Sequence, residues 1–420
     1  MVKSSDVFIA GGFPKITYIS RDEYHLESTI VDYLDTRHKI LSISGSTKSG
    51  KTVLVVKILP KQSSFWIPGG LVKDLNSFWG IVLEKTGGYT SISDTTTENK
   101  NTLSGRMMTA SIKPLGTGAD ITSQYNESNQ HEASQTLSRT IHSDSSAINQ
   151  LFTHMVPLVI DDFHYIDPDI QTLIIRSLKE PVFDGLPVIL ITVPHRAYDV
   201  MRVEKEMTGR VKQLQIPAWK TSELEKIAEL GFKALNVQCA PKIIKKMAKE
   251  SFDSPHLMQE FCLDLCKING IKETQLSLTQ LKEPDDWQSF FRNMDSNISK
   301  VAFERLARGP RQRTDRKERM LVNGENCDIY TAVLLAIAWT GPKTTLAYED
   351  IRTGLRTVLM SDAIPQGPDV MRILKMMSKI AKEIEGEPVV DWDPDTAYLH
   401  ISDPFFAYYL KWGVLVHTEK

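Results

Sequence analysis

The chain has 420 residues, of which 41% are hydrophobic and 24% charged, and its formal net charge at pH 7 is −2. This length predicts two or three domains, and the nearly balanced charge excludes a global attraction to nucleic acid or to an anionic membrane. We expect no signal peptide, because the first residues lack a long apolar core. We expect no membrane span, because no apolar run reaches roughly 18 residues. The four cysteines lack metal-ligand spacing, which favours a reducing, cytoplasmic setting. Cys262 and Cys266 are four residues apart on a predicted helix, and we expect two core thiols, with a ligand pair as the alternative.

The first predicted elements lead to a short apolar run at residues 40–44. Residues 13–19 are expected to be extended, and apolar positions at helical spacing predict a helix over 21–34. The run 40–44 has the length and composition of a strand. A helix over 51–59, ended by Pro60, is predicted after the loop that follows.

That loop matches the motif G-x-x-x-x-G-K-[ST] at every position, in the order strand, loop, helix that the motif requires. Its glycines let backbone amides approach phosphate oxygens, and the helix start adds its positive dipole end. Lys51 supplies a charge for the β- and γ-phosphates, and the Thr52 hydroxyl is a ligand for Mg²⁺. The predicted phosphate-binding residues are Gly45, Ser46, Thr47, Lys48, Ser49, Gly50, Lys51 and Thr52.

A polar insertion follows the next two elements. Residues 63–68 predict a second strand and 70–85 a helix, after which about 89–146 are rich in Ser, Thr, Asn and Gln. Within the insertion, 106–114 and 119–123 flank a Leu-Gly-Thr-Gly turn, which predicts a β-hairpin. An ordinary disordered loop is the alternative.

Residues 156–160 and 186–193 are continuous apolar runs, typical of strands that are buried on both faces of a parallel sheet. A helix over 168–178 connects them, and 213–217 predict a further strand. Strands that alternate with helices predict an α/β domain over residues 1–217.

Two adjacent acids, Asp161 and Asp162, end the first of these runs. A carboxylate at the end of a buried strand beside a phosphate loop holds Mg²⁺, usually through water. Asp161 is therefore predicted to share the metal with Thr52, and Asp162 to polarise the attacking water. A pair of solvated turn acids is the alternative.

Three more side chains are candidates for contact with the γ-phosphate. His195 and Arg196 follow the run 186–193, at the strand end where ligands of open α/β sheets bind, and are predicted sensors. Helix capping or an interdomain ion pair is the alternative for both. Arg210 lies at a surface turn and is either a finger that reaches a neighbouring subunit's nucleotide or a solvated side chain.

Helical patterns from residue 221 to about 271 predict a lid domain over 218–300. His256, in a Ser-Pro-His turn, is a candidate contact to the phosphates or else a helix-start residue. Residues 301–327 form a basic connector that could contact nucleic-acid phosphates, although its interspersed acids also fit a solvated face. The basic residues are Arg305, Arg308, Arg311, Arg313, Arg316, Lys317 and Arg319.

The last part of the chain has the pattern of a winged helix. Three helices are predicted between residues 329 and 384, and the segments 388–392 and 397–401 flank turn residues and predict a β-hairpin. Helices followed by such a hairpin predict a winged-helix domain over 328–420.

The order of these motifs resembles the AAA+-related STAND ATPases and the archaeal and bacterial ATPases nearest to the origin-recognition initiators. The resemblance spans nearly the whole chain. It implies an α/β P-loop NTPase domain with a parallel sheet, an all-α lid and a winged helix, with ATP and Mg²⁺ as ligands. Residues 18–26 are similar to the family's box near the adenine, although Ser20 replaces its glycine, and the resemblance assigns Tyr18 and Arg21 to the adenine side.

The resemblance implies an ATPase that acts as a nucleotide-controlled, oligomerising switch on a separate effector protein, with antiviral defence as a setting. A DNA-binding initiator or transposition regulator is one alternative, which would use the winged helix or the segment Arg305–Arg319. A scaffold that binds nucleotide without turnover is another. The resemblance implies ATP, and GTP is the alternative, although we find no copy of the GTP-specific Asn/Thr-Lys-x-Asp signature.

Overall fold

The computed structural model describes residues 1–87, 91–98, 105–111, 133–140, 143–154, 156–193, 209–292, 297–310, 317–341, 343–384 and 388–415. Contacts divide the chain into two compact units. The first unit comprises residues 1–24, 45–53 and 216–420, and the second unit comprises residues 25–44 and 54–215. The domain boundaries at 217, 300 and 327 stay predictions.

A five-stranded parallel sheet forms the centre of the second unit. Its order is β2-β6-β7-β1-β8. The strands are β1 (Ile40–Ser44), β2 (Phe65–Pro68), β6 (Leu158–Asp161), β7 (Val188–Thr192) and β8 (Val211–Gln215). Each predicted strand of this domain overlaps one of them, although β8 begins two residues before the predicted 213–217. In this register Ser44, the last residue of β1, lies opposite Thr192 of β7 and Gln215 of β8.

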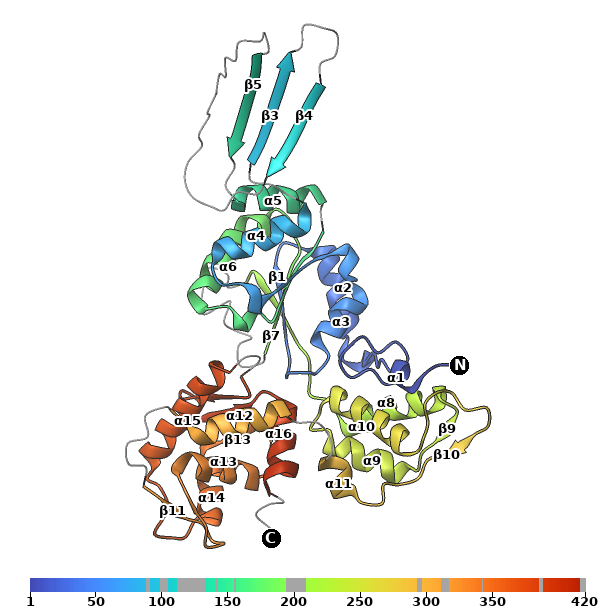
Figure 1. Cartoon of the computed structure of the whole chain (residues 1–420), viewed down its shortest axis with the longest axis vertical. Helices are drawn as coiled ribbons and strands as arrows, with labels where there is room; N and C mark the ends of the chain where they lie inside the picture. The colour runs from blue at the N-terminus through green and yellow to red at the C-terminus, as the bar shows by residue number, and fades with distance from the viewer. Residues whose placement is uncertain are drawn as a thin grey trace. The chain divides into compact units, whose positions relative to one another are not determined.

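Helices cover both faces of this sheet. α2 (Leu26–Thr36) and α3 (Lys51–Ile58) lie on one side, and α4 (Leu75–Thr86), α5 (Ser143–His154) and α6 (Pro168–Phe183) lie on the other (Figure 1). Short 3₁₀ turns also occur in this part of the chain: η1 (Asp22–Tyr24) precedes α2, and η2 (Lys61–Ser63), η3 (Gly69–Leu71) and η4 (Phe163–Tyr165) lie beside β2 and β6. The predicted helix over 70–85 begins only at Leu75, because the Asp74 carboxylate accepts the Ser77 amide at 2.7 Å and caps the helix there.

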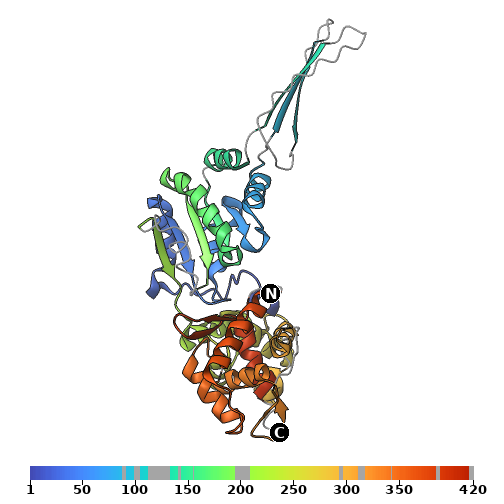
Figure 2. The same ribbon diagram turned by 90° about the vertical axis from the view of Figure 1, so that its left-hand side faces the viewer.

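The insertion contains a separate antiparallel sheet of order β4-β3-β5. Its strands are β3 (Ser91–Glu98), β4 (Gly105–Ser111) and β5 (Ala133–Thr140). Two views show this sheet extending away from α4 and α5 (Figures 1 and 2). β4 overlaps the first arm of the predicted hairpin but pairs with β3, and the predicted second arm, 119–123, lies outside the described residues.

The helices of the predicted lid pack in the first unit around one apolar core. They are α8 (Thr221–Ala234), α9 (Pro241–Glu250), α10 (Pro255–Ile268) and α11 (Trp287–Arg292), with a short parallel ladder of β9 (Val237–Gln238) and β10 (Thr279–Gln280). The N-terminal helix α1 (Ser4–Val7) is followed by Phe8, whose ring fills the space beside Gly231 of α8. Cys262 and Cys266 are buried in this core, as predicted.

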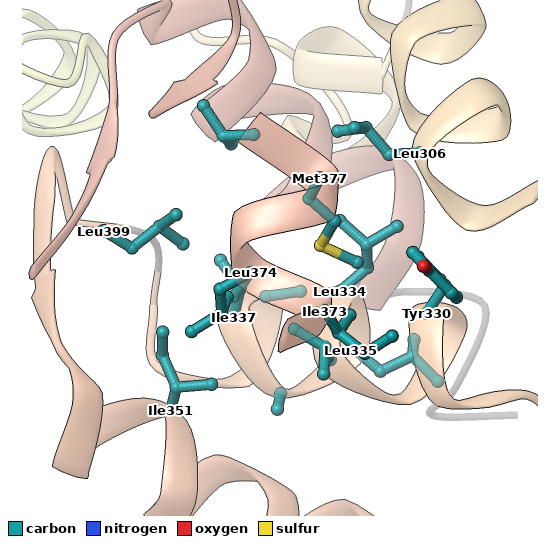
Figure 3. Close-up of a cluster of buried hydrophobic side chains, with 14 of the residues drawn as sticks. Leu306, Tyr330, Leu334, Leu335, Ile337, Ile351, Ile373, Leu374, Met377 and Leu399 are labelled. Carbon is teal, nitrogen blue, oxygen red and sulfur yellow. The ribbon is translucent and has the colours of Figure 1, made fainter. Parts of the chain in front are cut away.

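A second core of the first unit lies among the C-terminal elements. These are α12 (Asn297–Arg308), β11 (Arg319–Met320), β12 (Asn326–Cys327), α13 (Ile329–Trp339), β13 (Thr345–Ala347), α14 (Tyr348–Val358), α15 (Gly367–Lys382), β14 (Val390–Asp393), β15 (Tyr398–Ile401), α16 (Pro404–Tyr409) and the π-helical η7 (Leu410–Leu415). Figure 3 shows Leu334, Ile337, Leu374 and Met377 turned toward one another in this core.

This arrangement corrects one prediction and leaves another as it was. Arg305 and Arg308 are part of α12, whose Leu306 is fully buried, so the basic segment begins inside a packed helix and not in a connector. Strands β13, β15 and β14 form a three-stranded antiparallel sheet, which contains the predicted hairpin. The assignment of a winged helix stays a prediction.

Candidate functional site: a phosphate loop and the strand ends

The phosphate loop, residues 45–52, leads directly from β1 into α3. Its turn depends on backbone angles that side chains rarely adopt, since φ is +57° at Lys48 and +93° at Gly50. A Cβ on Gly45 would lie 3.0 Å from the Ile216 Cβ and from the Ser49 Oγ. Close packing therefore favours glycine at position 45, and the left-handed turn favours glycine at position 50.

Lys51 is buried inside its own loop. Its Nζ donates to the carbonyl oxygens of Gly45 and Ser46, each at 2.8 Å, and the residue is only 7% exposed. Ser49 is also buried, and its Oγ has no hydrogen-bond partner among the described residues. A buried ammonium group beside an unsatisfied hydroxyl forms a cradle that suits an anion.

A connector between β8 and α8 holds one side of the loop. The Trp219 indole Nε1 donates to the Ser49 carbonyl oxygen at 2.8 Å. The Arg21 guanidinium lies over the Trp219 ring, 4.7 Å from its centroid. Arg21 also donates to Glu223 and to the carbonyl oxygens of Pro217 and Ala218, at 2.8, 3.0 and 3.0 Å.

Arg21 is thus bonded to protein along its whole fork, and its side chain is 2% exposed. Tyr18 stacks on Phe13 with the rings 12° from parallel. A direct contact of Tyr18 or Arg21 with the adenine stays a prediction, while the structure gives Arg21 an evident role in fixing the connector.

The start of α16 contacts the loop through Lys48. The Lys48 Nζ lies 3.9 Å from the centroid of the Phe405 ring and 3.8 Å from the Asp403 Oδ1. His256, the predicted lid contact, packs edge-on against the same Phe405 ring at 5.1 Å and is 3.2 Å from Glu260. His256 and Lys48 of the phosphate loop therefore contact the same aromatic ring, that of Phe405.

The predicted acidic residues lie at the carboxyl end of β6 in the second unit. Asp161 ends β6, and its Oδ1 accepts the amide of Asp162 at 3.1 Å. Asp162 adopts a left-handed backbone with φ of +53°, which costs about 1–3 kcal/mol in a residue with a Cβ. A Cβ on Gly69 would lie 2.3 Å from the Asp162 carbonyl oxygen, so only glycine fits beside this turn.

Thr192 is a candidate site residue that sequence reasoning missed. It is the last residue of β7, it is 3% exposed, and its Oγ1 has no hydrogen-bond partner in the described part of the chain. Its partner in the register is Ser44, the residue directly before the phosphate loop. In the sequence, Thr192 differs from its neighbours only as a polar residue at the end of an otherwise apolar strand. Only the strand order shows that it pairs with the residue before the loop.

The remaining predicted site residues stay predictions. His195 and Arg196 lie outside the described residues. Arg210 is exposed just before β8, and its carbonyl oxygen accepts the Ile40 amide at 2.9 Å. Its role as a finger and the nucleic-acid role of Arg305–Arg319 stay predictions.

The donor set suits Mg²⁺ only together with phosphate. Within the described ranges no three His, Cys, Asp or Glu side chains are grouped so that they could hold a metal ion. Thr52 and Asp161 provide oxygen atoms, the ligand type that Mg²⁺ prefers, and phosphate and water oxygens normally complete its shell.

No helix among the described residues has the length and hydropathy to cross a membrane.

Comparison with solved structures bears on the fold. A Walker-type ATPase of Pyrococcus abyssi aligns with 94% of this chain and 96% of its own, at 12% identity and a TM-score of 0.50. The chain has the fold of a P-loop ATPase. The predicted α/β fold is thereby confirmed, with the sheet order and the loop after β1 described above.

Two further structures align over most of the chain at lower similarity. Cdc6p from Pyrobaculum aerophilum is 12% identical, with coverage of 100% and 99% and a TM-score of 0.41. A signal transduction ATPase with numerous domains, which carries a tetratricopeptide repeat sensor, comes from Pyrococcus horikoshii. It is 13% identical, covers 96% of this chain and 46% of its own, and has a TM-score of 0.35. No protein-family model matches the chain, and no curated protein sequence matches it.

Proposed function

We propose that this protein is a Mg²⁺-dependent ATPase. The observation that carries the proposal is the phosphate loop itself: a buried Lys51 whose Nζ is held at 2.8 Å by two carbonyl oxygens of its own loop, directly after β1 of the parallel sheet. Neutral carbonyl oxygens are weaker partners for an ammonium group than phosphate oxygens are. Lys51 is thus placed to exchange them for the β- and γ-phosphates.

Each residue has a task that its chemistry supports. The amides of residues 45–52 and the start of α3 bind the phosphates. Bound Mg²⁺ would neutralise charge on the β- and γ-phosphates, and Thr52 and, through water, Asp161 would hold it. We assign Asp162 to orient and polarise the attacking water.

Two substitutions test this proposal. Lys51→Ala should abolish binding of MgATP in titration calorimetry. Asp162→Asn should keep binding and lower the hydrolysis rate at least tenfold, because it removes a carboxylate that polarises water and leaves the loop intact. Ser63→Ala, in an exposed turn of the second unit, is the control and should behave as wild type. Wild-type protein that binds no nucleotide would end the proposal, and equal turnover in Asp162→Asn would remove the role of that residue.

We further propose that nucleotide state controls oligomerisation and action on a separate effector protein. The contact of Lys48 with Asp403 and Phe405 supports this part, because it links the phosphate loop to the C-terminal elements. Phe405→Ala should lower the ATP concentration at which oligomers appear in light scattering, and Tyr398→Ala, at an exposed position, should not. Identical monomeric profiles with ATP and with ADP would refute the switch.

The proposed setting is antiviral defence beside a separate effector. Cells that carry the wild-type gene and its neighbours should resist phage plating, and Lys51→Ala should remove the resistance. Equal plating on both would argue against defence without touching the ATPase proposal. DNA binding is the other outcome, and it would appear as a gel shift that weakens steeply with salt.

A further inference from the structure

Trp219 is the only tryptophan among the described residues whose indole N–H bonds to the phosphate loop, at 2.8 Å from the Ser49 carbonyl oxygen. The peptide that begins with this carbonyl also carries the N–H of Gly50. Because a peptide unit is planar, fixing the direction of the Ser49 C=O also fixes the direction of the Gly50 N–H, which points the opposite way. An anchor on one side of this peptide therefore aims an amide on the other.

This peptide lies in a turn of unusual backbone angles, one of which belongs to a glycine. Lys48 and Gly50 both have positive φ angles, and glycine adopts many others at little cost. The Ser49 amide itself bonds to the Ser46 carbonyl oxygen at 3.2 Å. Trp219 supplies a bond to the following peptide from outside the loop.

Trp219 is itself rigidly held. It is 9% exposed, and the Arg21 guanidinium lies 4.7 Å from its ring centroid. Arg21 fixes the two residues before Trp219 by their carbonyl oxygens and bonds to Glu223 of α8. Glu223 in turn accepts the Lys220 amide at 2.7 Å, at the start of the same helix. The loop peptide and the start of α8 are therefore linked by hydrogen bonds and by the cation–π contact between Arg21 and Trp219.

We infer that Trp219 is a positioning residue, which aims the Gly50 amide at the phosphates of a bound nucleotide and couples phosphate binding to α8. This inference rests on the proposed nucleotide binding. It specifies that Trp219 acts on the phosphates and not on the base, so its effect extends to any ligand with a polyphosphate group.

The test uses Trp219→Phe, which removes the N–H and keeps a ring for Arg21 to cover. Trp287→Phe is the matched control, because Trp287 also donates its indole N–H at 2.8 Å, to Glu283, within the same group of helices. We expect Trp219→Phe to raise the Kd of MgATP and of inorganic tripolyphosphate by a similar factor, about 3- to 10-fold. Trp287→Phe should leave both values unchanged.

A spectroscopic readout separates positioning from general stability. In a ¹⁵N–¹H spectrum of the wild type, the indole peak that is missing in Trp219→Phe should shift when tripolyphosphate is added, and the Trp287 peak should not. If Trp219→Phe does not fold, Trp219→Leu, which also removes the ring N–H, replaces it and should bind both ligands less tightly than wild type.

The outcomes distinguish this inference from the proposed function. If wild type binds neither ligand, both the proposed function and the inference are refuted. If wild type binds both and Lys51→Ala binds neither, but Trp219→Phe binds as wild type does, the inference alone is wrong. An effect on ATP without one on tripolyphosphate would assign Trp219 to the base and also overturn the inference.

Discussion

Arg21→Met removes a guanidinium group that is almost completely buried. Its partner Glu223 has a side chain only 6% exposed and would lose the bond from the Arg21 Nε at 2.8 Å. The carbonyl oxygens of Pro217 and Ala218 would also lose their donors. Breaking a buried ion pair by removing one partner costs about 3–5 kcal/mol, because the remaining charge stays buried without its opposite charge.

This cost converts to a shift of the melting temperature. For a folding unit of roughly 150–250 residues, 1 kcal/mol lowers Tm by about 2–4 °C, so Arg21→Met should unfold about 6–20 °C below wild type. Circular dichroism at rising temperature measures this. Lys220→Met is the control, because the Lys220–Glu23 pair is nearly as close, at 3.0 Å, but its side chains are 58% and 55% exposed. Solvent screens such a pair, and we expect no measurable shift of Tm.

A double variant tests the physical reason. The double variant Arg21→Met/Glu223→Met also removes the carboxylate that has lost its partner. It should therefore melt at a higher temperature than the single variant Arg21→Met. The Lys220 amide would still lack its acceptor, so full recovery is not expected. The reasoning is refuted if Arg21→Met and Lys220→Met have the same Tm, or if the double variant has a Tm no higher than that of Arg21→Met.

Two further predictions concern packing and thiol chemistry. Gly354→Ala should destabilise by about 1–3 kcal/mol in urea unfolding, because its Cβ would lie 2.5 Å from the Ala336 carbonyl oxygen, whereas Gly80→Ala, with nothing within 4 Å in α4, should stabilise by about 0.5–1 kcal/mol. Burial raises the pKa of Cys239 and Cys266 to about 12, so both thiols should react with Ellman's reagent only after denaturation. Because unfolded thiols ionise near pH 8.5, the stability linked to this raised pKa is complete below that pH and should fall above it, which Tm measured from neutral to alkaline pH would reveal. Rapid thiol reaction in the native protein, or equal urea midpoints for the two alanine variants, would contradict these predictions.

Part of the candidate site follows from local patterns. The phosphate loop was predicted residue by residue, because a turn between a strand and a helix needs Gly45, Gly50, Lys51 and Thr52 at fixed separations along the chain. The five strands were predicted because a parallel sheet buried on both faces needs continuous apolar runs. Such patterns involve residues that are close in the sequence, so they can be recognised without knowledge of the fold.

The inserted sheet shows where this reasoning fails. β3 and β5 are polar strands without the alternation that marks a half-buried strand, so their sequence did not distinguish them from a loop. The start of α12 was also missed, because the arginines at its end suggested a connector while the buried Leu306 was not recognised. In both cases the missing information lay in pairing and burial.

The sequence by itself determined that a phosphate loop follows a buried strand, because the motif is local. Only the tertiary structure decided what holds that loop. Trp219 reaches Ser49 across 170 residues of chain, and Arg21 reaches Glu223 across 202. Contacts at such separations depend on how connectors and helices pack, and no spacing in the sequence encodes them. The same holds for Thr192. Its hydroxyl is not distinguished from others in the sequence, and only the strand register shows that Thr192 pairs with Ser44, the residue before the loop.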